Sequence, residues 1–546
     1  MKNEERKINN WEKNSGILRE RYPGLAEGIA GAESCPAELN IAILKNDAGM
    51  PTMTINGAFV HSARDPAREG RRLAEASLGL TDCGIAGSPA GPVIILGFGL
   101  GYAAEAAAEL APGRPVIIVE KYFCLLRKAF EERDLSRLLL REGIAFVPGG
   151  TGEGVIKVLS FFEKKAGGQA LPDQKANPAI MRNRALTGID GEWYGAVENR
   201  IRTWVMQDDV NKATQAKFGR RWERNMRRNM DAIRDLPGIA RLAGLAGPLG
   251  KNEAAKTFPV FLAAAGPSLD RIAPLLPEIR KRCIIVAVDT SLRFLLAHGV
   301  DPDFTVVADP QFWNSRHLDC MQREQPHTRL IIELAVYPSV LRLPCGGMFL
   351  CGSIYPMGES IEAKVDPKGR LGTGGSVATT AWDFSRILGT DAIWISGLDL
   401  SFPGLKTHFK GALFEDKALA ESNRLNPAET WLVKALRDGI PFSAPSISGG
   451  QVLTDRRLSL YAAWFESNFR QNPGIRNYSL SSDGLAIAGL EPSGTESLLA
   501  LPDRRCEIES GWKKHFPASK PNLMSRRKKT GGGKSMKRKH YKFQFG

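Results

Sequence analysis

Two short turns in the second half of the chain have the residue types to hold a phosphate group. In VFLAAAGPSLDRI, the residues Gly266, Pro267 and Ser268 follow an apolar run and precede a helix. Glycine lets backbone N–H groups face an anion at a helix N-terminus, and the serine hydroxyl adds another donor. The same residues also suit an ordinary helix N-cap, so a purely structural role for this turn stays open.

The second turn consists of Thr373, Gly374, Gly375 and Ser376. Its glycines permit positive φ angles, and its hydroxyls can bind phosphate or sugar oxygens. Two such turns on one sheet favour a nucleotide ligand. Neither turn ends in the Gly-Lys-Ser or Gly-Lys-Thr of a P-loop, so we expect a different kind of phosphate site.

Three aspartates and one histidine complete the set of candidate residues. Asp289, Asp309 and Asp399 each end an apolar run, and His408 lies just beyond Asp399. A carboxylate at a strand end can bind ribose hydroxyls, hold a metal through phosphate, or act as a base. Histidine titrates near neutral pH and suits proton transfer. Helix capping by one or two of the aspartates, and an isolated surface histidine, are the alternatives.

Strands that alternate with helices between about residues 259 and 414 must position these side chains. That alternation predicts an α/β fold with a mainly parallel central sheet. Ligands of such sheets bind at the carboxyl ends of the strands. Gly266, Asp289, Asp309 and Asp399 all fall at those ends. We therefore expect them along one edge of the sheet, with the two glycine turns side by side.

A Rossmann-like unit is predicted upstream. Gly97, Gly99 and Gly101 follow an apolar strand and precede an alanine-rich helix, and the next strand ends at Glu120. This order is typical of dinucleotide folds, in which the acid accepts ribose hydroxyls. The glycines alone also suit a tight strand-to-helix turn that binds nothing, and both interpretations stay open.

The sequence pattern divides the chain into six segments. They are a β-meander region with a helical start (1–85), the Rossmann-like domain (86–190), a helical connector (191–250), a central α/β domain (251–430), a smaller, mostly helical C-terminal region (431–518) and a disordered basic tail (519–546). The connector carries five arginines that predict a solvated helix face or, less simply, a partner-binding helix: Arg220, Arg221, Arg224, Arg227 and Arg228.

The composition excludes a largely disordered chain, a collagen-like repeat protein and a small disulfide-rich protein. Hydrophobic residues make up 43% and charged residues 24%, as in ordinary globular proteins, and no apolar run reaches the ~18 residues of a membrane span. The net charge is +15, but ten Lys or Arg lie in the tail, which leaves +5 for the rest. The basic charge is thus weak evidence for nucleic-acid binding.

Eight cysteines without a Cys-x-x-Cys pair predict a reduced, cytoplasmic protein with buried thiols and no zinc site.

The ordered motifs resemble a known family. AAAGPSLDRI, IIVAVDTSLRFLLAHGVDPDFTVVADP and GTGGSVATTAWDFSRILGTDAIWISGLDLSF are similar to the central domain of bacterial motility accessory factor proteins. NDAGMPTMTINGAFVHSARDP and VIILGFGLGY look like that family's N-terminal region, so the resemblance covers most of residues 40–490. It implies a GT-A-like flagellin glycosyltransferase. Such proteins move a nonulosonic acid, of pseudaminic or legionaminic type, from a CMP-activated donor to Ser or Thr hydroxyls.

The central motifs also look like those of bacterial sialyltransferases. Gly266–Ser268 match a donor-binding turn of that family, although Ala265 stands where the family has an asparagine. Asp289 falls where those enzymes carry a second asparagine, and Thr373–Ser376 match a Ser-Gly-rich turn near the donor. GLDL resembles a Gly-Ile-Asp-Phe strand end, and His408 follows it, where a catalytic histidine is expected.

The resemblance therefore implies an inverting transferase in which His408 or Asp399 takes the acceptor proton. The two turns, with Asp289 and Asp309, would bind the CMP-sugar donor. A metal is not required for a good leaving group such as CMP, although a divalent cation stays open at the aspartates. The central domain is also shared with archaeal 6-hydroxymethylpterin diphosphokinases, which use ATP and magnesium. A non-catalytic protein that binds flagellin before export is the third interpretation.

Overall fold

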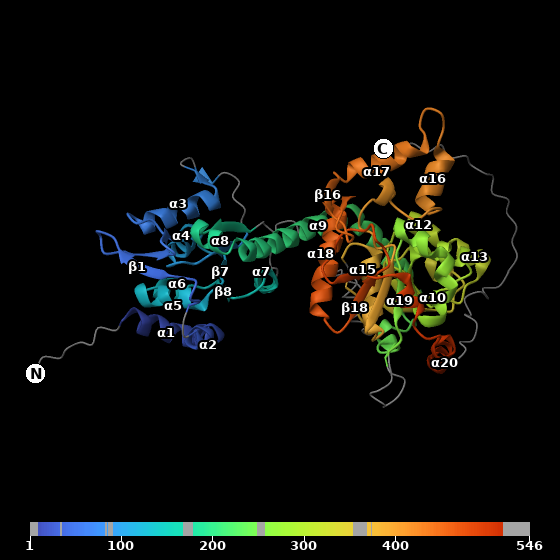
Figure 1. Cartoon of the computed structure of the whole chain (residues 1–546), viewed down its shortest axis with the longest axis horizontal. Coiled ribbons are helices and arrows are strands. Elements are labelled where there is room, and N and C mark those ends of the chain that lie inside the picture. Colours follow the sequence, from blue (N-terminus) through green and yellow to red (C-terminus); the bar gives the residue numbers. More distant parts are fainter. Residues whose placement is uncertain are drawn as a thin grey trace, which may run out of the picture. The chain divides into compact units, whose positions relative to one another are not determined.

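The computed structural model describes residues 9–32, 35–81, 84–85, 91–166, 178–247, 257–352, 368–372 and 374–516. The chain forms two compact units, Met1–Gln215 and Ala216–Gly546 (Figure 1). The division falls inside the predicted connector, where helix α9 runs unbroken over Gly191–Ile233. Thr373, Cys83 and the predicted tail at 519–546 lie outside the described residues.

The N-terminal unit combines a small antiparallel meander with a parallel sheet. The meander has the order β1-β2-β3, as the Asn-Asp and Asn-Gly turns predict, and the parallel sheet has the order β8-β7-β6-β9. In chain order the elements are α1 Asn10–Arg21, α2 Pro23–Gly31, β1 Ile41–Lys45, β2 Pro51–Ile55, β3 Ala58–Phe59, α3 Pro66–Leu78, β4 Leu80–Thr81, β5 Gly84–Ile85, β6 Val93–Leu96, α4 Tyr102–Leu110, β7 Val116–Glu120, α5 Phe123–Glu132, α6 Ser136–Leu140, β8 Ile144–Pro148, α7 Gly152–Ala166, β9 Ala179–Arg182 and α8 Arg184–Ile189.

The glycine turn after β6 is closed by the protein's own side chains. The N–H of Phe98 donates to Glu120 at 2.9 Å, and the N–H of Leu100 donates to His61 Nε2 at 2.7 Å. Glu120 is fully buried and also accepts from the Tyr194 hydroxyl. The backbone donors and the acid that a dinucleotide would need are therefore already used. The structure supports the tight-turn interpretation and contradicts a ribose-binding role for Glu120.

One cysteine pair departs from the sequence expectation. Cys35 and Cys124 form a disulfide with an S–S distance of 1.94 Å, so the prediction that every thiol is reduced was wrong. The two cysteines are 89 residues apart in the sequence, so no short Cys-Cys spacing indicated that they form a disulfide. The free cysteines of the described residues include buried Cys283 and Cys351 and exposed Cys506.

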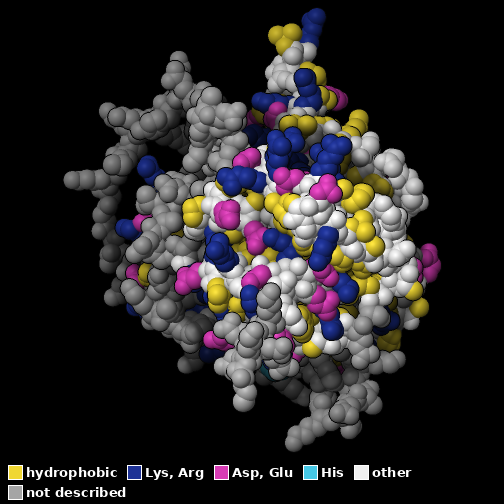
Figure 2. Space-filling view, turned by 90° about the vertical axis from the view of Figure 1, so that its left-hand side faces the viewer, with side chains coloured by type: hydrophobic (Ala, Val, Ile, Leu, Met, Phe, Trp, Pro, Cys, Tyr) yellow, Lys and Arg dark blue, Asp and Glu magenta, His cyan; other side chains and the backbone are white. Residues whose placement is uncertain are grey.

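Charges of both signs are interspersed on the face of the N-terminal unit shown in Figure 2. Several pair along or between helices, as Arg71 does with Glu75, Arg127 with Glu131 and Lys13 with Asp134. The described side chains of this face thus form no single basic patch of the kind that binds nucleic acid.

The C-terminal unit is built on one sheet of eight parallel strands. Its elements after α9 are β10 Val260–Ala263, the 3-10 segment η3 Pro267–Leu275, α10 Leu276–Arg282, β11 Ile284–Val288, α11 Asp289–Ala297, β12 Phe304–Val307, α12 Phe312–Ser315, α13 Cys320–Glu324, β13 Arg329–Glu333, β14 Gly347–Cys351, α15 Val377–Ile387, β15 Ala392–Ser396, α16 Leu413–Glu421, α17 Ala428–Asp438, β16 Phe442–Pro445, β17 Gln451–Thr454, α18 Arg456–Gln471, β18 Arg476–Ser479, β19 Leu490–Pro492, α19 Thr495–Leu499 and α20 Arg505–His515. Short 3-10 turns are η2 Ile239–Leu242, η4 Arg316–Leu318, η5 Val340–Arg342 and η6 Pro403–Leu405.

The strand order of this sheet is β14-β13-β12-β11-β10-β15-β18-β19. From β10 the chain adds strands in one direction as far as β14 and then returns to add β15, β18 and β19 on the other side. The order therefore reverses between β10 and β15, which is where open α/β sheets bind ligands. This confirms the predicted α/β fold with a mainly parallel central sheet.

Helices bury both faces of the sheet, which explains why its strands read as continuous apolar runs. On one face, Val260 and Leu262 of β10 pack with Trp382 of α15 and Phe465 of α18. On the other face, alternate residues of β10 pack with η3, α10 and α11. The region 431–518 contains the predicted helices, and it also supplies β18 and β19 to the central sheet. Among the described residues, no helix is both long enough and apolar enough to cross a membrane.

The closed glycine turn generates a stability prediction. Gly99 has φ +56, and a Cβ there would overlap the His61 ring. We expect Gly99→Ala to destabilise the N-terminal unit by roughly 2–5 kcal/mol, because backbone strain and overpacking add. The matched control is Gly113→Ala, which has φ +87 but open space around its Cβ and should cost only about 1–2 kcal/mol. Calorimetric unfolding of both variants measures the difference, and equal losses would contradict the packing described here.

Candidate functional site

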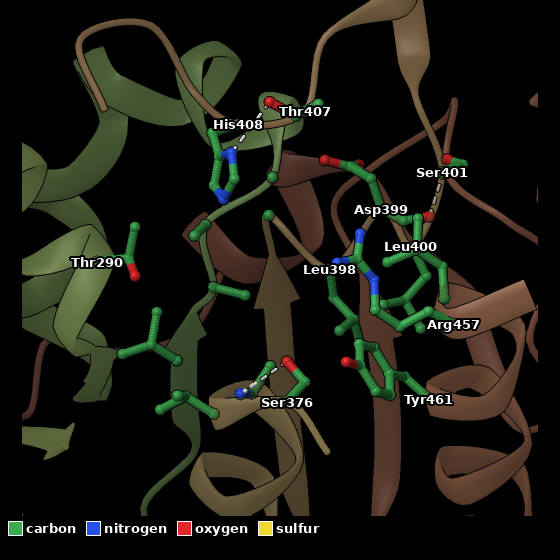
Figure 3. A pocket seen from close by; sticks show the side chains of 18 of the residues that line it. Thr290, Ser376, Leu398, Asp399, Leu400, Ser401, Thr407, His408, Arg457 and Tyr461 are labelled. Atoms are coloured by element: carbon green, nitrogen blue, oxygen red, sulfur yellow. Dashed lines mark hydrogen bonds between the residues drawn. The ribbon is translucent and has the colours of Figure 1, made fainter. Parts of the chain in front are cut away.

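A cavity of about 460 Å³ opens at the point where the strand order reverses. Its walls come from the segments that follow β10, β11 and β15, from the N-terminus of α15, from the loop before α16 and from the first turns of α18. The lining includes five of the residues selected from the sequence: Gly266, Gly375, Ser376, Asp399 and His408. Figure 3 shows this cavity from close by.

Asp399 ties three segments together at the base of the cavity. It is 2% exposed, and its carboxylate accepts from the Ser268 N–H at 2.9 Å and from the Ser481 hydroxyl at 2.8 Å. Burial raises the pKa of Asp399, while these hydrogen bonds oppose that shift. Its backbone carbonyl accepts from the N–H of Leu485 at 2.8 Å. Both carboxylate oxygens are thus engaged within the protein, which is the geometry of a positioning residue.

The turn at Gly266–Ser268 is locked onto the end of β15. The Gly266 N–H donates to the carbonyl of Gly397 at 2.7 Å, and the Ser268 hydroxyl accepts from the Gly397 N–H at 2.9 Å. A Cβ at Gly266 would overlap the Asp399 carboxylate. The N–H groups that we expected to face a phosphate are therefore occupied, and Pro267 and Ser268 do not line the cavity. These bonds favour the structural interpretation of this turn.

The second turn faces the cavity but is glycine-rich for a packing reason. A Cβ at Gly374 would lie 2.5 Å from Trp464, and one at Gly375 would lie 2.7 Å from Tyr461. The Gly374 N–H donates to the Thr379 hydroxyl at 2.8 Å. Ser376 is the N-cap of α15 and accepts from the Ala378 N–H. The N-terminus of this eleven-residue helix lines the cavity and supplies a positive end for an anion.

Asp289 and Asp309 lie outside the lining of the cavity, although their neighbours Val288 and Thr290 belong to it. Asp289 is 2% exposed; one oxygen accepts from the Thr290 N–H, and the other has no partner among the described residues. Burial, aided by the charge of Asp309, raises the pKa of Asp289 to about 7. Burial also raises the pKa of Asp309. Within the described residues, no group of three or more His, Cys, Asp or Glu side chains is arranged to hold a metal.

His408 is the titratable base of the cavity. One ring nitrogen lies 3.1 Å from the Thr407 hydroxyl, and Figure 3 shows the other directed into the cavity. Burial lowers the pKa of His408 to about 4, with smaller contributions from His317 and Arg457. The imidazole is therefore neutral at physiological pH and has a nitrogen free to accept a proton.

Two further residues face the cavity and were missed by the sequence reading. Arg457 and Tyr461 belong to α18, and Figure 3 shows both side chains reaching into the cavity. The Arg457 guanidinium lies 3.4 Å from Asp455, and its side chain is 62% exposed, so it can still meet a ligand. Arg457 and Tyr461 are four residues apart, so they lie on one face of the helix, and this spacing could have indicated that they act together. It was overlooked because α18 follows the recognised motifs by more than 40 residues.

The strand-end segment also carries local strain at the cavity wall. Leu400 has φ +44, an uncommon value for a residue other than glycine. Its carbonyl accepts from the buried Thr454 hydroxyl at 2.8 Å, which holds this backbone in place. Strained backbone of this kind clusters at binding sites and is consistent with a functional role for the cavity.

Comparison with known proteins gives one domain family. Residues 227–404 match the family described as 6-hydroxymethylpterin diphosphokinase MptE-like. Two uncharacterized proteins of Treponema pallidum (strain Nichols) are also similar. One is 37% identical over 239 residues, which cover 38% of this chain and 60% of that protein. The other is 25% identical over 274 residues, which cover 49% of this chain and 85% of that protein.

A solved structure shares the fold over nearly the whole chain. It is the MAf glycosyltransferase from Magnetospirillum magneticum AMB-1, with a TM-score of 0.56 and 17% sequence identity over 93% of this chain and 79% of that chain. The fold of this chain is thus similar to that of a motility accessory factor protein. The two comparisons confirm the resemblance predicted from the motifs, for the central domain and for the fold.

Asp289 provides a test of the electrostatics beside the cavity. Its pKa is higher in the folded chain than the ordinary value near 3.8, so the folded state binds the extra proton. Stability from this group is present below about pH 4 and is lost as the pH rises through about 7. We expect Asp289→Asn to remove that loss, so that its melting temperature relative to wild type rises between pH 5 and pH 8. A difference that is constant over this range would contradict the raised pKa.

Proposed function

We propose that this protein is a glycosyltransferase that moves a nonulosonic acid from a CMP-activated donor to a Ser or Thr hydroxyl of flagellin. The observation that carries the proposal is one cavity, at the reversal of strand order, in which neutral His408 and cationic Arg457 both face the interior. The fold shared with a MAf glycosyltransferase supports the same class of activity.

The anionic donor suits the positive side of the cavity. A CMP-nonulosonic acid carries a phosphate and a carboxylate, and Arg457 can form charge-assisted hydrogen bonds with either group. The N-terminus of α15, with Ser376 at its cap, adds donors and the positive end of the helix dipole. Tyr461 supplies a hydroxyl on the same wall. In this proposal these residues replace the backbone of the Gly266–Ser268 turn as the phosphate-binding group.

The transfer step needs one base and one stabilised leaving group. The acceptor hydroxyl oxygen attacks the anomeric carbon on the face opposite the phosphate, and its proton passes to the free ring nitrogen of His408. The bond from the anomeric carbon to the phosphate oxygen breaks, and its electron pair leaves with CMP, whose charge Arg457 neutralises. The configuration inverts. Asp399 is a positioning residue. Its carboxylate accepts hydrogen bonds from the Ser268 N–H and the Ser481 hydroxyl and so fixes the Gly266–Ser268 turn at the base of the cavity.

The proposal assigns the protein to the cytoplasm, with flagellin as the protein acceptor. Free thiols such as Cys506 are compatible with that compartment, whereas the Cys35–Cys124 bond is unusual there. Both assignments rest on the family resemblance.

A second activity is favoured by the family that matches residues 227–404. In a pyrophosphokinase of that type, ATP would occupy the cavity, and the hydroxymethyl group of a pterin would attack its β-phosphate and release AMP. The same base and the same cation would serve that reaction. ATP-dependent AMP release in the presence of the pterin decides for it, and CMP release with flagellin decides for the transferase.

The first test is the transfer reaction itself. Incubation of the full chain with unmodified flagellin and a CMP-nonulosonic acid should add whole sugar residues to the intact mass of flagellin. We expect His408→Ala to lower kcat by roughly 10²–10⁴-fold, the usual contribution of a general base. Arg457→Gln should chiefly raise KM for the donor. Lys410→Ala, an exposed neighbour of the same loop, is the control and should behave as wild type. An unmodified flagellin mass with wild-type protein would refute the proposal.

The second test concerns the base in the absence of substrate. In an NMR titration of histidine-labelled protein, His408 should titrate near pH 4 rather than near 6.5. Arg457→Gln should raise that pKa modestly, because it removes a nearby positive charge but leaves the larger effect of burial. Arg457→Lys keeps the charge and should leave the pKa unchanged. A wild-type value near 6.5 would show that the imidazole is solvated.

A further inference from the structure

A second cavity, of about 360 Å³, lies at the opposite edge of the central sheet. Asp301 and Asp303 line it just before β12, and His327 lines it just before β13. Arg505 and Trp512 of α20 and Arg280 of α10 also line it. These are the amino ends of the strands, whereas the cavity with His408 lies at the carboxyl ends. None of the described residues lines both cavities.

The two aspartates of this second cavity accept hydrogen bonds from within its wall. The Asp303 carboxylate receives two hydrogen bonds from the Arg505 guanidinium, at 2.6 and 3.0 Å, and one from Trp512 Nε1 at 3.0 Å. The backbone N–H groups of His327 and Thr328 donate to Asp301, at 2.6 and 3.2 Å. Both aspartates are thus engaged within the wall, although their charges also act on nearby Arg329 and oppose the lowering of its pKa by burial.

Arg329 is a cation of the cavity wall with a donor that finds no acceptor among the described residues. Its guanidinium lies 4.3 Å from the centre of the Phe516 ring and 5.7 Å from that of Trp512. Its Nε is buried and has no hydrogen-bond partner among the described residues. Stacking on aromatic rings attracts the charge but leaves the N–H donors unsatisfied, and an unsatisfied buried donor is costly. Burial lowers the pKa of Arg329, yet a guanidinium stays charged at any physiological pH.

The lining of this cavity, with Arg329 included, carries one more positive than negative side chain. Four Lys or Arg side chains line the cavity against three acids: Arg280, Arg329, Arg505 and Lys513, with Asp301, Asp303 and Glu509. Lys513 is exposed at the rim, while Arg280 and Arg505 are held by Glu509 at 3.9 and 2.9 Å. We propose that this cavity is a binding site for a small organic anion, whose phosphate or carboxylate accepts hydrogen bonds from Arg329 with Lys513 at the entrance.

Inorganic pyrophosphate and citrate are the two probes, because they separate phosphate from carboxylate recognition. Calorimetric titration uses the full chain carrying Arg457→Gln, which weakens anion binding in the first cavity. We expect at least one probe to bind in this background, and the tighter one identifies the group recognised. Adding Arg329→Met should weaken that binding at least tenfold. Arg342→Met, which removes an exposed arginine outside the cavity, is the matched control and should leave it unchanged.

Thermal unfolding separates a binding role from a structural one. If Arg329 serves a ligand, Arg329→Met should melt no lower than its parent without a probe, and the rise in melting temperature caused by the probe should disappear. No binding of either probe in the Arg457→Gln background overturns the proposal. So does binding that survives Arg329→Met, whether or not that variant melts lower. Neither readout involves sugar transfer, so failure here is distinct from failure of the proposed function.

Discussion

The candidate site depends on one buried carboxylate. Strands β10 and β15 are neighbours, but the chain leaves them in opposite directions across the sheet, so their carboxyl ends would diverge without a link. Asp399 supplies that link through the Ser268 N–H and the Ser481 hydroxyl. Its burial is costly for a charge, and the hydrogen bonds compensate only in part, since its pKa is still raised. A polar group this well satisfied in a core fixes geometry more than it contributes stability.

This constraint explains why the glycine pattern was ambiguous. Gly266 is glycine because the Asp399 carboxylate occupies the space of a Cβ, and Gly375 is glycine because the Tyr461 ring does. A loop that cradles phosphate and a loop that accepts a close side chain both require glycine, and the sequence cannot distinguish them. The same holds in the N-terminal unit, where His61 and Glu120 fill the turn that a dinucleotide would need.

The strands and helices that are determined by local sequence pattern could be predicted. Apolar runs such as IIVAV and VFLA, followed by turns and helices, predict buried parallel strands, and β10, β11, β12 and β15 lie where they were expected. Two strands of the central sheet that the sequence pattern did not assign to it, β18 and β19, are short and partly polar, with RNYS and LEP as their sequences. They join the sheet through tertiary pairing that no local pattern reports. The Cys35–Cys124 bond was missed for the same reason.

The site residues also divide into those that local sequence indicates and those that only tertiary packing brings to the cavity. His408 and Asp399 follow a strand in sequence and could be selected, whereas Arg457 reaches the cavity only because α18 packs across the turn before α15. Their electrostatic relation depends on that packing. Burial, then the charges of His317 and Arg457, lower the pKa of His408. In the proposed reaction, an anionic donor would neutralise Arg457 and raise the proton affinity of His408. The base would then become stronger when the donor is bound, so that proton abstraction from the acceptor is coupled to occupancy of the site.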